Sequence, residues 1–339
     1  MSRLRIGFIG CGGMAGVHAA RLDGLGDRMA VTAAADIDLA RAEGVAARFA
    51  GANAVTDYES ILDDVDAVLI ALPHHLHHVA TKRCLAAGKH VLLEKPMANT
   101  EADCLDLIDS ARRSDRTFMI AYNLRYNPCV IRMKELLEAE AYGECFQFSI
   151  WTEQLTQRDP SHWYCREETV GGGQLFSHGC HYIDLLLWFL GKPVCGTHLG
   201  TNYGTPWMEK EGTSNVTVQF ESGALGYHFG TWGARGTRLQ YSFHAHCTEG
   251  MLEFHRNGDL SKGGERLTVH QAGREDVLFE GTSGKTTQEE MAHFIDCIES
   301  GREPRTIAED SLAGLRVIWR LYEAEEQNTV ADLSGISLS

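Results

Sequence analysis

The stretch "IGFIGCGGMAGVH" at residues 6–18 decides the fold of the first half of this 339-residue chain. A short apolar run ends there at Gly10, and a helix-like segment follows. Gly10, Gly12 and Ala15 follow a G-x-G-x-x-A spacing, in which each of the three positions has its own steric requirement. The first glycine permits the sharp bend, the second lets the backbone approach a pyrophosphate, and the small third residue packs helix on strand. Unpaired N–H groups at the helix start favour such an anion, so the stretch predicts dinucleotide binding.

An acidic residue, Asp36, ends the next apolar run, "AVTAAAD" at residues 30–36. A carboxylate at this place accepts hydrogen bonds from the adenosine ribose hydroxyls and repels a 2′-phosphate, whereas proteins that bind NADP usually place an arginine nearby. Ile37 and Asp38 follow, and the nearest basic residue is Arg41, which would have to fold back. We therefore predict NAD as the cofactor, with NADP the weaker alternative.

Five apolar runs alternate with helical patterns in the first third of the chain. The runs lie at residues 5–10, 30–36, 67–72, 90–94 and 118–122. Strands that are apolar throughout and separated by helices indicate a parallel sheet covered on both faces. We expect residues 1–122 to form an α/β dinucleotide-binding Rossmann domain.

The pattern changes after "NLRYNP" at residues 123–128. Residues 171–191 read as a helix with glycine at both ends, and helices are also expected near 288–300 and 308–326. Strand-like runs lie at 145–152, 214–220, 224–232, 238–246, 250–254, 266–271 and 276–280. This order predicts that residues 123–339 form an α+β domain, built on an open, mostly antiparallel sheet with helices on one side. We assign substrate binding and oligomerisation to this second domain.

Composition narrows the class of protein. The formal charge of −15 argues against nucleic acid or anionic membrane as a partner. No apolar run approaches the roughly 20 residues that span a bilayer. The N-terminus enters a strand pattern within a few residues, so we expect no signal peptide. The ten cysteines contain no C-x-x-C pair, which is typical of a reducing compartment. We predict a cytoplasmic protein.

Four histidines crowd the segment "ALPHHLHHVA" at residues 71–80. His74 and His78 are four residues apart and would share one face of a helix, as paired zinc ligands do. Two ligands do not complete a zinc site, and no third is evident near this sequence. We predict that no metal binds here.

Two further motifs resemble the glucose–fructose oxidoreductase/inositol dehydrogenase (Gfo/Idh/MocA) family. One is Glu94-Lys95-Pro96 after a buried strand, and the other is "GGGQLFSHGCHYID" at residues 171–184. The resemblance extends by motif from Arg5 to about Gly191, and it implies an NAD(P)-dependent oxidoreductase. Such an enzyme transfers a hydride between nicotinamide and a secondary alcohol of a sugar, glycoside or cyclic polyol.

The resemblance also implies which residues contact the cofactor. Relatives carry Pro-Asn-x-x-His after a strand, matched here by Pro73 and His77 with His74 in the Asn position, so the histidine-rich segment is a turn at the cofactor's edge. The predicted cofactor-binding residues are Gly10, Gly12, Gly13, Met14, Ala15, Asp36, Ile37, Leu72, Pro73, His74, His77, Glu94, Lys95 and Asn123.

Lys95 and His181 are the predicted catalytic residues. A neutral imidazole suits proton abstraction from the hydroxyl, and an ammonium suits stabilisation of the developing alkoxide, although a desolvated lysine is also able to act as base. Relatives commonly have Asp where this chain has Ser177, a change that we attribute to specificity. Ser177, His181 and Asp184 would share one helix face. The predicted substrate-binding residues are Lys95, Arg125, Trp163, Tyr164, Ser177, His178 and His181.

Two other functions stay open at this point. One is an enzyme that cleaves glycosides by transiently oxidising the sugar, with NAD regenerated in each turnover. The other is a ligand-sensing regulator that kept the fold without turnover. We also expect a homodimer or homotetramer, because only one face of the second sheet is able to pack on its own helices.

Overall fold

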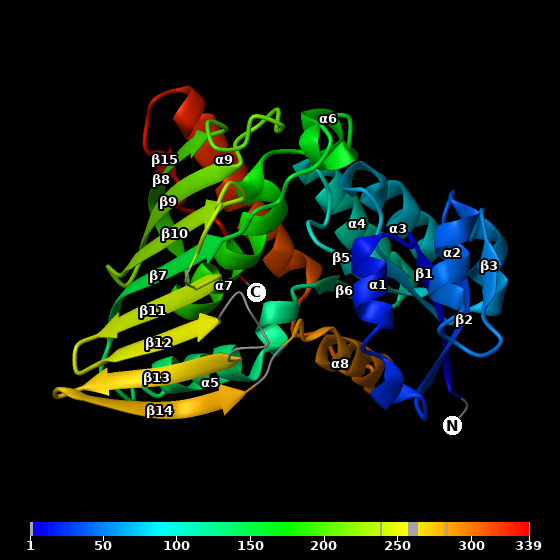
Figure 1. The fold of residues 1–339 in the computed structure, drawn as a ribbon, viewed down its shortest axis with the longest axis horizontal. Helices are drawn as coiled ribbons and strands as arrows, with labels where there is room; N and C mark the ends of the chain where they lie inside the picture. The colour runs from blue at the N-terminus through cyan, green and yellow to red at the C-terminus, as the bar shows by residue number, and fades with distance from the viewer. Residues whose placement is uncertain (1–2, 238, 257–263, 282–283, 339) are drawn as a thin grey trace. The chain divides into compact units, whose positions relative to one another are not determined.

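The computed structural model describes residues 3–237, 239–256, 264–281 and 284–338. The chain forms two compact units (Figure 1). The first unit consists of Met1–Asn123 and Lys285–Leu312, and the second consists of Leu124–Gly284 and Ala313–Ser339.

The first unit is built on a six-stranded parallel sheet with the order β3-β2-β1-β4-β5-β6 (Figure 1). Its strands are β1 (Leu4–Ile9), β2 (Met29–Ala35), β3 (Asn53–Val55), β4 (Ala67–Ile70), β5 (His90–Glu94) and β6 (Phe118–Ala121). The five predicted strands are confirmed. The three-residue β3 was not predicted, because it lacks a buried apolar run. The strand order reverses between β1 and β4, and in such sheets ligands bind at the carboxyl ends of the strands at that point.

Two of the helices of the first unit begin with a side-chain cap. The α-helices are α1 (Gly13–Ala19), α2 (Leu39–Ala46), α3 (His77–Ala86), α4 (Glu101–Ser114) and α8 (Thr287–Ser300). The Asp38 carboxylate accepts the N–H of Ala40 to cap α2, and the Thr100 hydroxyl accepts the N–H of Asp103 to cap α4. Each cap satisfies a donor that the helix itself leaves unpaired.

The segment Lys285–Leu312 differs from the expected division of the chain. The expected boundary near residue 123 matches the first crossing, but this later segment belongs to the first unit and not to the second. The reason lies in its contacts: α8 packs against α1, the N–H of Ile120 donates to the carbonyl of Thr306 at 3.0 Å, and the Tyr122 hydroxyl meets that of Ser311.

The second unit is built on a nine-stranded mixed sheet with the order β14-β13-β12-β11-β7-β10-β9-β8-β15 (Figure 1). All neighbouring pairs are antiparallel except β7 and β10. The strands are β7 (Cys145–Glu153), β8 (Pro193–Thr201), β9 (Thr213–Phe220), β10 (Leu225–Thr231), β11 (Tyr241–Cys247), β12 (Met251–Arg256), β13 (Glu265–Gln271), β14 (Arg274–Gly281) and β15 (Ala331–Asp332).

The mostly antiparallel sheet and seven of its strands are confirmed. β8 and β15 were not predicted. β8 begins at proline and contains Gly196 and Gly200, which hide its alternation of apolar and polar residues. Arg238, at the start of the run expected over 238–246, lies outside the described residues.

One face of this sheet is buried and the other is open. Along β9 the side chains of Val216, Val218 and Phe220 are buried, and the residues between them are exposed. The helices of this unit are α5 (Pro128–Glu138), α6 (Glu167–Val170), α7 (Cys180–Leu190) and the greater part of α9 (Ala308–Glu326). Figure 1 shows α5, α7 and α9 on the same side of the sheet. In the described part of the chain, no helix combines the length and apolar character that crossing a membrane requires.

Candidate active site

The glycine turn after β1 is tight on one side and open on the other. Gly10 has φ +83°, and its N–H donates to the carbonyl of Ala35 at 2.8 Å. A Cβ on Gly10 would lie 2.5 Å from the carbonyl oxygen of Ala71, so only glycine fits. At Gly12 and Gly13, by contrast, a Cβ would meet no atom within 4 Å. This exposed backbone fits the close approach of a dinucleotide pyrophosphate.

Asp36 stands directly beside that turn. Its Oδ2 accepts the N–H of Cys11 at 2.7 Å, and its Oδ1 accepts the N–H of Asp38 at 2.9 Å. Burial, aided by the Asp36 charge, raises the pKa of the Cys11 thiol to about 12. Arg41 Nε lies 3.2 Å from the Asp38 carboxylate and so faces Asp38. Ile37 is 94% exposed, which leaves a free apolar surface next to the ribose position.

The histidine-rich segment is built into the fold by backbone and carboxylate contacts. His77 is fully buried, with Nδ1 2.8 Å from the carbonyl of Pro96 and Nε2 2.9 Å from the carbonyl of Leu72. Burial lowers the pKa of His77, and the two carbonyls oppose this effect. His77 thus ties the turn after β4 to the turn after β5. It has no nitrogen left for the cofactor, which differs from the predicted direct contact.

The other histidines of this segment do not converge on one point. His78 Nε2 lies 2.7 Å from Asp106, His75 is exposed, and His74 is buried with its ring 5.6 Å from that of His77. Within the residues that the structure describes, no three His, Cys, Asp or Glu side chains have the geometry of a metal site.

The Glu-Lys-Pro motif ends β5 at the carboxyl edge of the parallel sheet. Glu94 is buried and its Oε1 lies 2.9 Å from Nε2 of the fully buried His18. Burial alone would raise the pKa of Glu94, but the hydrogen bond and charge of His18 outweigh it and lower the pKa. Lys95 follows, partly exposed, and its peptide bond to Pro96 is cis. Glu94 therefore anchors the strand end on α1, and Lys95 is the side chain left at the edge.

Two residues near this edge were missed by the sequence analysis. Lys285 Nζ lies 3.0 Å from Sδ of Met14 at the start of α1. Glu290 on α8 is fully buried, and among the described residues neither of its carboxylate oxygens has a hydrogen-bond partner. Burial, reinforced by the charge of Glu94, raises the pKa of Glu290 well above its ordinary value. The sequence pattern could have identified Glu290 as a buried acid, since it shares the apolar helix face of Met291 and Phe294.

In the second unit, the helix of the GGG motif has an unusual first turn. Leu175–Gly179 is π-helical and α7 continues from Cys180. A π-turn holds more residues than an α-turn, so the residues of this stretch are not spaced as in a regular α-helix. The side chains of Ser177 and His181 are both buried, His181 with an exposed fraction of 6%.

Arg125 and Asp184 form a buried pair within the second unit. Arg125 Nε donates to Oδ2 of Asp184 at 2.9 Å, and a terminal guanidinium nitrogen donates to Oδ1 at 2.7 Å. The guanidinium also lies 5.3 Å from the ring centroid of Trp188. Asp184 is therefore bound to Arg125 within the second unit. The pair holds α7 against the residues that follow the Rossmann strands.

Aromatic side chains surround the beginning of that helix. The Tyr164 ring lies 5.2 Å from Trp163 and 4.8 Å from Trp232. Burial raises the pKa of Tyr164, an effect that Ser177 partly opposes. His178 Nε2 lies 3.2 Å from the Tyr182 hydroxyl. The structure thus gathers four of the predicted substrate residues, Tyr164, Ser177, His178 and His181, around one helix start.

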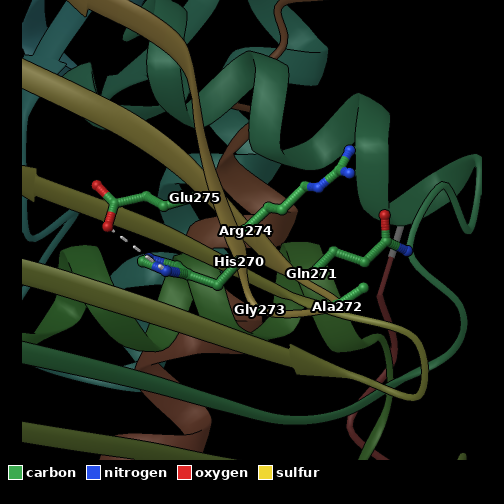
Figure 2. Close-up of a pocket in the computed structure, with 6 residues that line it drawn as sticks. All are labelled: His270, Gln271, Ala272, Gly273, Arg274 and Glu275. Carbon is green, nitrogen blue, oxygen red and sulfur yellow. Dashed lines mark ion pairs between the residues drawn. The ribbon is translucent and has the colours of Figure 1, made fainter.

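The remaining predicted residues take simple places. Ala15 is a fully buried residue of α1, Leu72 and Pro73 form the turn after β4, and the Asn123 carbonyl accepts the hydroxyl of Thr286. A shallow hollow of about 390 Å³ lies beside the β13–β14 turn, where His270 and Glu275 point toward each other (Figure 2). No predicted site residue lines it.

Comparison with known proteins defines the class. Residues 4–122 match the family described as oxidoreductase family, NAD-binding Rossmann fold, and residues 130–253 match the GFO/IDH/MocA C-terminal domain. The fold and the glycine turn therefore define an NAD(P)-binding oxidoreductase. The chain belongs to the glucose–fructose oxidoreductase/inositol dehydrogenase (Gfo/Idh/MocA) family.

Three relatives illustrate its range. The chain is 28% identical over 236 residues to levoglucosan dehydrogenase of Pseudarthrobacter phenanthrenivorans, a match that covers 62% of this chain and 60% of that protein. It is 28% identical to D-xylose 1-dehydrogenase (NADP(+)) 2 of Haloferax volcanii, over 89% of this chain and 91% of that protein. The structure of aldose–aldose oxidoreductase from Caulobacter crescentus, complexed with glycerol, superposes with a TM-score of 0.87 at 25% identity and covers 98% of this chain and 100% of that one.

Proposed function

We propose that the chain is an NAD-dependent dehydrogenase that acts on a secondary alcohol of a sugar, glycoside or cyclic polyol. The observation that carries the proposal is the pair of motif residues: Lys95 at the carboxyl edge of the parallel sheet, and His181 on the buried helix of the second unit. Relatives of the chain include the levoglucosan and xylose dehydrogenases. The particular substrate differs between them.

Lys95 and His181 are proposed to act together on the same substrate hydroxyl. When bound, the dinucleotide supplies the carbon that accepts the hydride. His181 takes the hydroxyl proton, a role worth about 10²–10⁴ in rate. Lys95 donates a hydrogen bond to the oxygen on which negative charge develops. Tyr164, Ser177 and His178 surround His181 and are proposed to hold the substrate hydroxyls, with Trp163 against an apolar face of the sugar ring.

We propose NAD over NADP on the basis of Asp36. Its carboxylate would accept both ribose hydroxyls and repel a 2′-phosphate. Arg41, the nearest basic side chain in the sequence, is paired with Asp38. Relatives differ in this respect, since the Haloferax volcanii enzyme is named for NADP(+).

Replacing Asp36 with alanine is expected to weaken NAD binding and to narrow the gap between NAD and NADP. The change removes the two ribose hydrogen bonds and the repulsion together. Titration of the reduced cofactors by fluorescence measures both dissociation constants, with Asp63→Ala, at an exposed position of the same unit, as the control. A wild-type protein that already binds NADP more tightly than NAD would contradict this interpretation of Asp36.

A panel of sugars, glycosides and cyclic polyols tested with NAD and NADP addresses the function itself. We expect stoichiometric formation of NADH with at least one member. Cleavage of a glycoside without net NADH would favour the redox-neutral lyase or hydrolase. A stoichiometric NAD complex that is inert across the whole panel would favour a ligand-sensing regulator.

The open face of the second sheet is proposed to join copies of the chain. Leu199, Phe229 and Trp151 lie in one row across β8, β10 and β7, because Leu199 and Phe229 both pair with Asn215 and Phe229 pairs with Trp151. Leu199 is 71% exposed and Trp151 is 39% exposed. An exposed apolar row of this kind is typical of an association surface.

Light scattering of the wild-type protein at micromolar concentration is expected to give the mass of a dimer or tetramer. Trp151→Asp should shift the mass toward the monomer, whereas Tyr203→Asp, at a 95% exposed loop position, should not. A strictly monomeric wild type would refute the proposal. None of the ten cysteines, all of which lie in the described residues, is part of a disulfide, and on that basis we propose the reducing cytoplasm as the location.

A further inference from the structure

The helix that carries His181 begins on two side chains from distant parts of the second unit. The first N–H groups of a helix have no partner within it and need one elsewhere. Here the Tyr322 hydroxyl accepts the N–H groups of Gly173 and Phe176, each at 3.2 Å. Glu211 accepts the other two: its carbonyl takes the N–H of Gln174 at 2.7 Å, and its Oε1 takes the N–H of Leu175 at 3.1 Å.

Glu211 and Tyr322 are also bound to each other, since the Tyr322 hydroxyl donates to Oε1 of Glu211 at 2.6 Å. The pair therefore holds all four N–H groups of residues 173–176. The N–H of Ser177 is the next along the chain, and it donates to the carbonyl of Gly173 at 3.0 Å. The hydrogen bond within the helix at Ser177 therefore comes directly after the four N–H groups that Glu211 and Tyr322 accept.

The glycines of the motif fit this arrangement sterically. A Cβ on Gly173 would lie 2.1 Å from Oε2 of Glu211 and 2.3 Å from its carbonyl oxygen. A Cβ on Gly172 would lie 2.6 Å from Cβ of Phe176 and 3.3 Å from the Tyr322 ring. Glycine is needed at residue 173 because Glu211 approaches the backbone so closely.

Glu211 is reached by solvent through a cavity of about 510 Å³ that lies wholly within the second unit. The ionisable residues that line it with Glu211 and Tyr322 are Glu167 of α6, Glu209 and Lys210 of the preceding loop, and Glu325 and Glu326 of α9. Lys210 pairs with Glu167, Arg166 pairs with Glu209, and Glu325 accepts from His198 of β8. None of these three pairs reaches the N–H groups of residues 173–176.

Burial raises the pKa of Glu211 from its ordinary value of 4.5 to about 7, although its Tyr322 and Leu175 contacts pull the pKa down. Because the folded-state pKa is raised, the stabilisation by this group is complete below about pH 4.5 and is lost as the pH rises through about 7. The hydrogen bonds that Glu211 accepts change in the opposite direction. An ionised carboxylate accepts the N–H of Leu175 and the Tyr322 hydroxyl more strongly than a protonated one does.

We propose that Glu211 and Tyr322 are positioning residues that set where the helix carrying Ser177 and His181 begins, and thereby where His181 stands. The inference deepens the proposed dehydrogenase function, on which its catalytic meaning rests. Neither residue need touch the substrate, because both act through the backbone of residues 173–176.

Two measurements on the full-length protein test the proposal without any substrate. In Tyr322→Phe, amide hydrogen exchange at Gly173 and Phe176 should accelerate by about 5- to 10-fold, because one hydrogen-bond acceptor is lost from each. The imidazole NMR resonance of His181, assigned by its absence from His181→Ala, should move in the same variant. In Glu211→Ala, exchange of the Leu175 amide should accelerate and the His181 resonance should move. Glu211→Gln keeps the acceptor oxygen, so the Leu175 exchange rate and the His181 resonance should remain as in the wild type.

The pH dependence gives a readout that a merely structural residue would not move. After correction for intrinsic exchange, protection of the Leu175 amide in the wild type should increase severalfold between about pH 6 and pH 8 as Glu211 ionises. In Glu211→Gln the protection should not change with pH.

The control variants carry the same type of substitution, Tyr→Phe or Glu→Gln, at residues that do not bind the N–H groups of residues 173–176. Tyr227→Phe removes a hydroxyl that donates to Asn215 on the same sheet, and Glu325→Gln removes a charge from the same cavity. Both should leave amide protection at residues 173–176 and the His181 resonance unchanged. If Glu211→Ala fails to fold, Glu211→Gln and Tyr322→Phe carry the test.

Unchanged exchange in Tyr322→Phe, or faster exchange with an unmoved His181 resonance, would overturn the proposal. Neither signal depends on NADH formation, so a failed sugar panel would sink the dehydrogenase proposal alone. With a probe sugar from that panel, Tyr322→Phe should lower kcat by about tenfold while leaving NAD affinity unchanged.

Discussion

His181→Ala is expected to lower kcat by about 10²–10⁴-fold, which corresponds to about 3–5 kcal/mol of transition-state stabilisation. In the proposed mechanism the imidazole takes the hydroxyl proton while the hydride leaves, so its loss should also flatten the acid limb of the pH profile. NAD affinity should barely change, because His181 belongs to the second unit and the glycine turn and Asp36 belong to the first.

Initial rates over a range of pH and a separate NAD titration measure these effects. His75→Ala is the matched control, since His75 is exposed and has no part in the proposed chemistry. If His181→Ala keeps the wild-type kcat while Lys95→Ala abolishes it, the lysine is the base and the two roles are reversed.

Lys95→Ala is expected to lower kcat strongly and to raise the substrate KM more than His181→Ala does. The ammonium would hold the reacting oxygen in both the ground state and the transition state, so its loss weakens binding as well as turnover. Lys82→Ala provides the control, because Lys82 forms a surface pair with Asp106.

The double variant lacking both side chains should be little slower than either single one. The two groups act on one proton transfer, and effects on a shared step do not add. Fully additive losses of kcat would contradict a shared step and assign Lys95 and His181 to separate ones.

Much of the fold was predictable, because local patterns carry it. The glycine turn at residues 10–12 requires a sharp bend, and the strands β1, β4, β5 and β6 are buried over most of their length. The short β3 and the glycine-containing β8 were not predicted, since their pairing is decided by neighbours far away in the sequence.

The candidate site was predictable residue by residue but not in its connections. His77 appeared in a motif, yet its two carbonyl partners, Leu72 and Pro96, lie on two different turns. Asp184 shared the expected helix face with His181, but the salt bridge to Arg125 occupies it. Such contacts join segments tens of residues apart, and periodicity along one helix does not report them.

The sequence by itself determined the parallel sheet and the glycine turn with its acid at Asp36, because each depends on neighbouring residues. Lys95 and His181 were predicted from the resemblance of their motifs to the family. The tertiary structure alone decided that Lys285–Leu312 returns to the first unit, with the buried Glu290 on α8. It also decided that Glu211 and Tyr322 accept the four N–H groups at the start of the His181 helix. The physical reason is that unpaired N–H groups must find acceptors wherever the folded chain brings them.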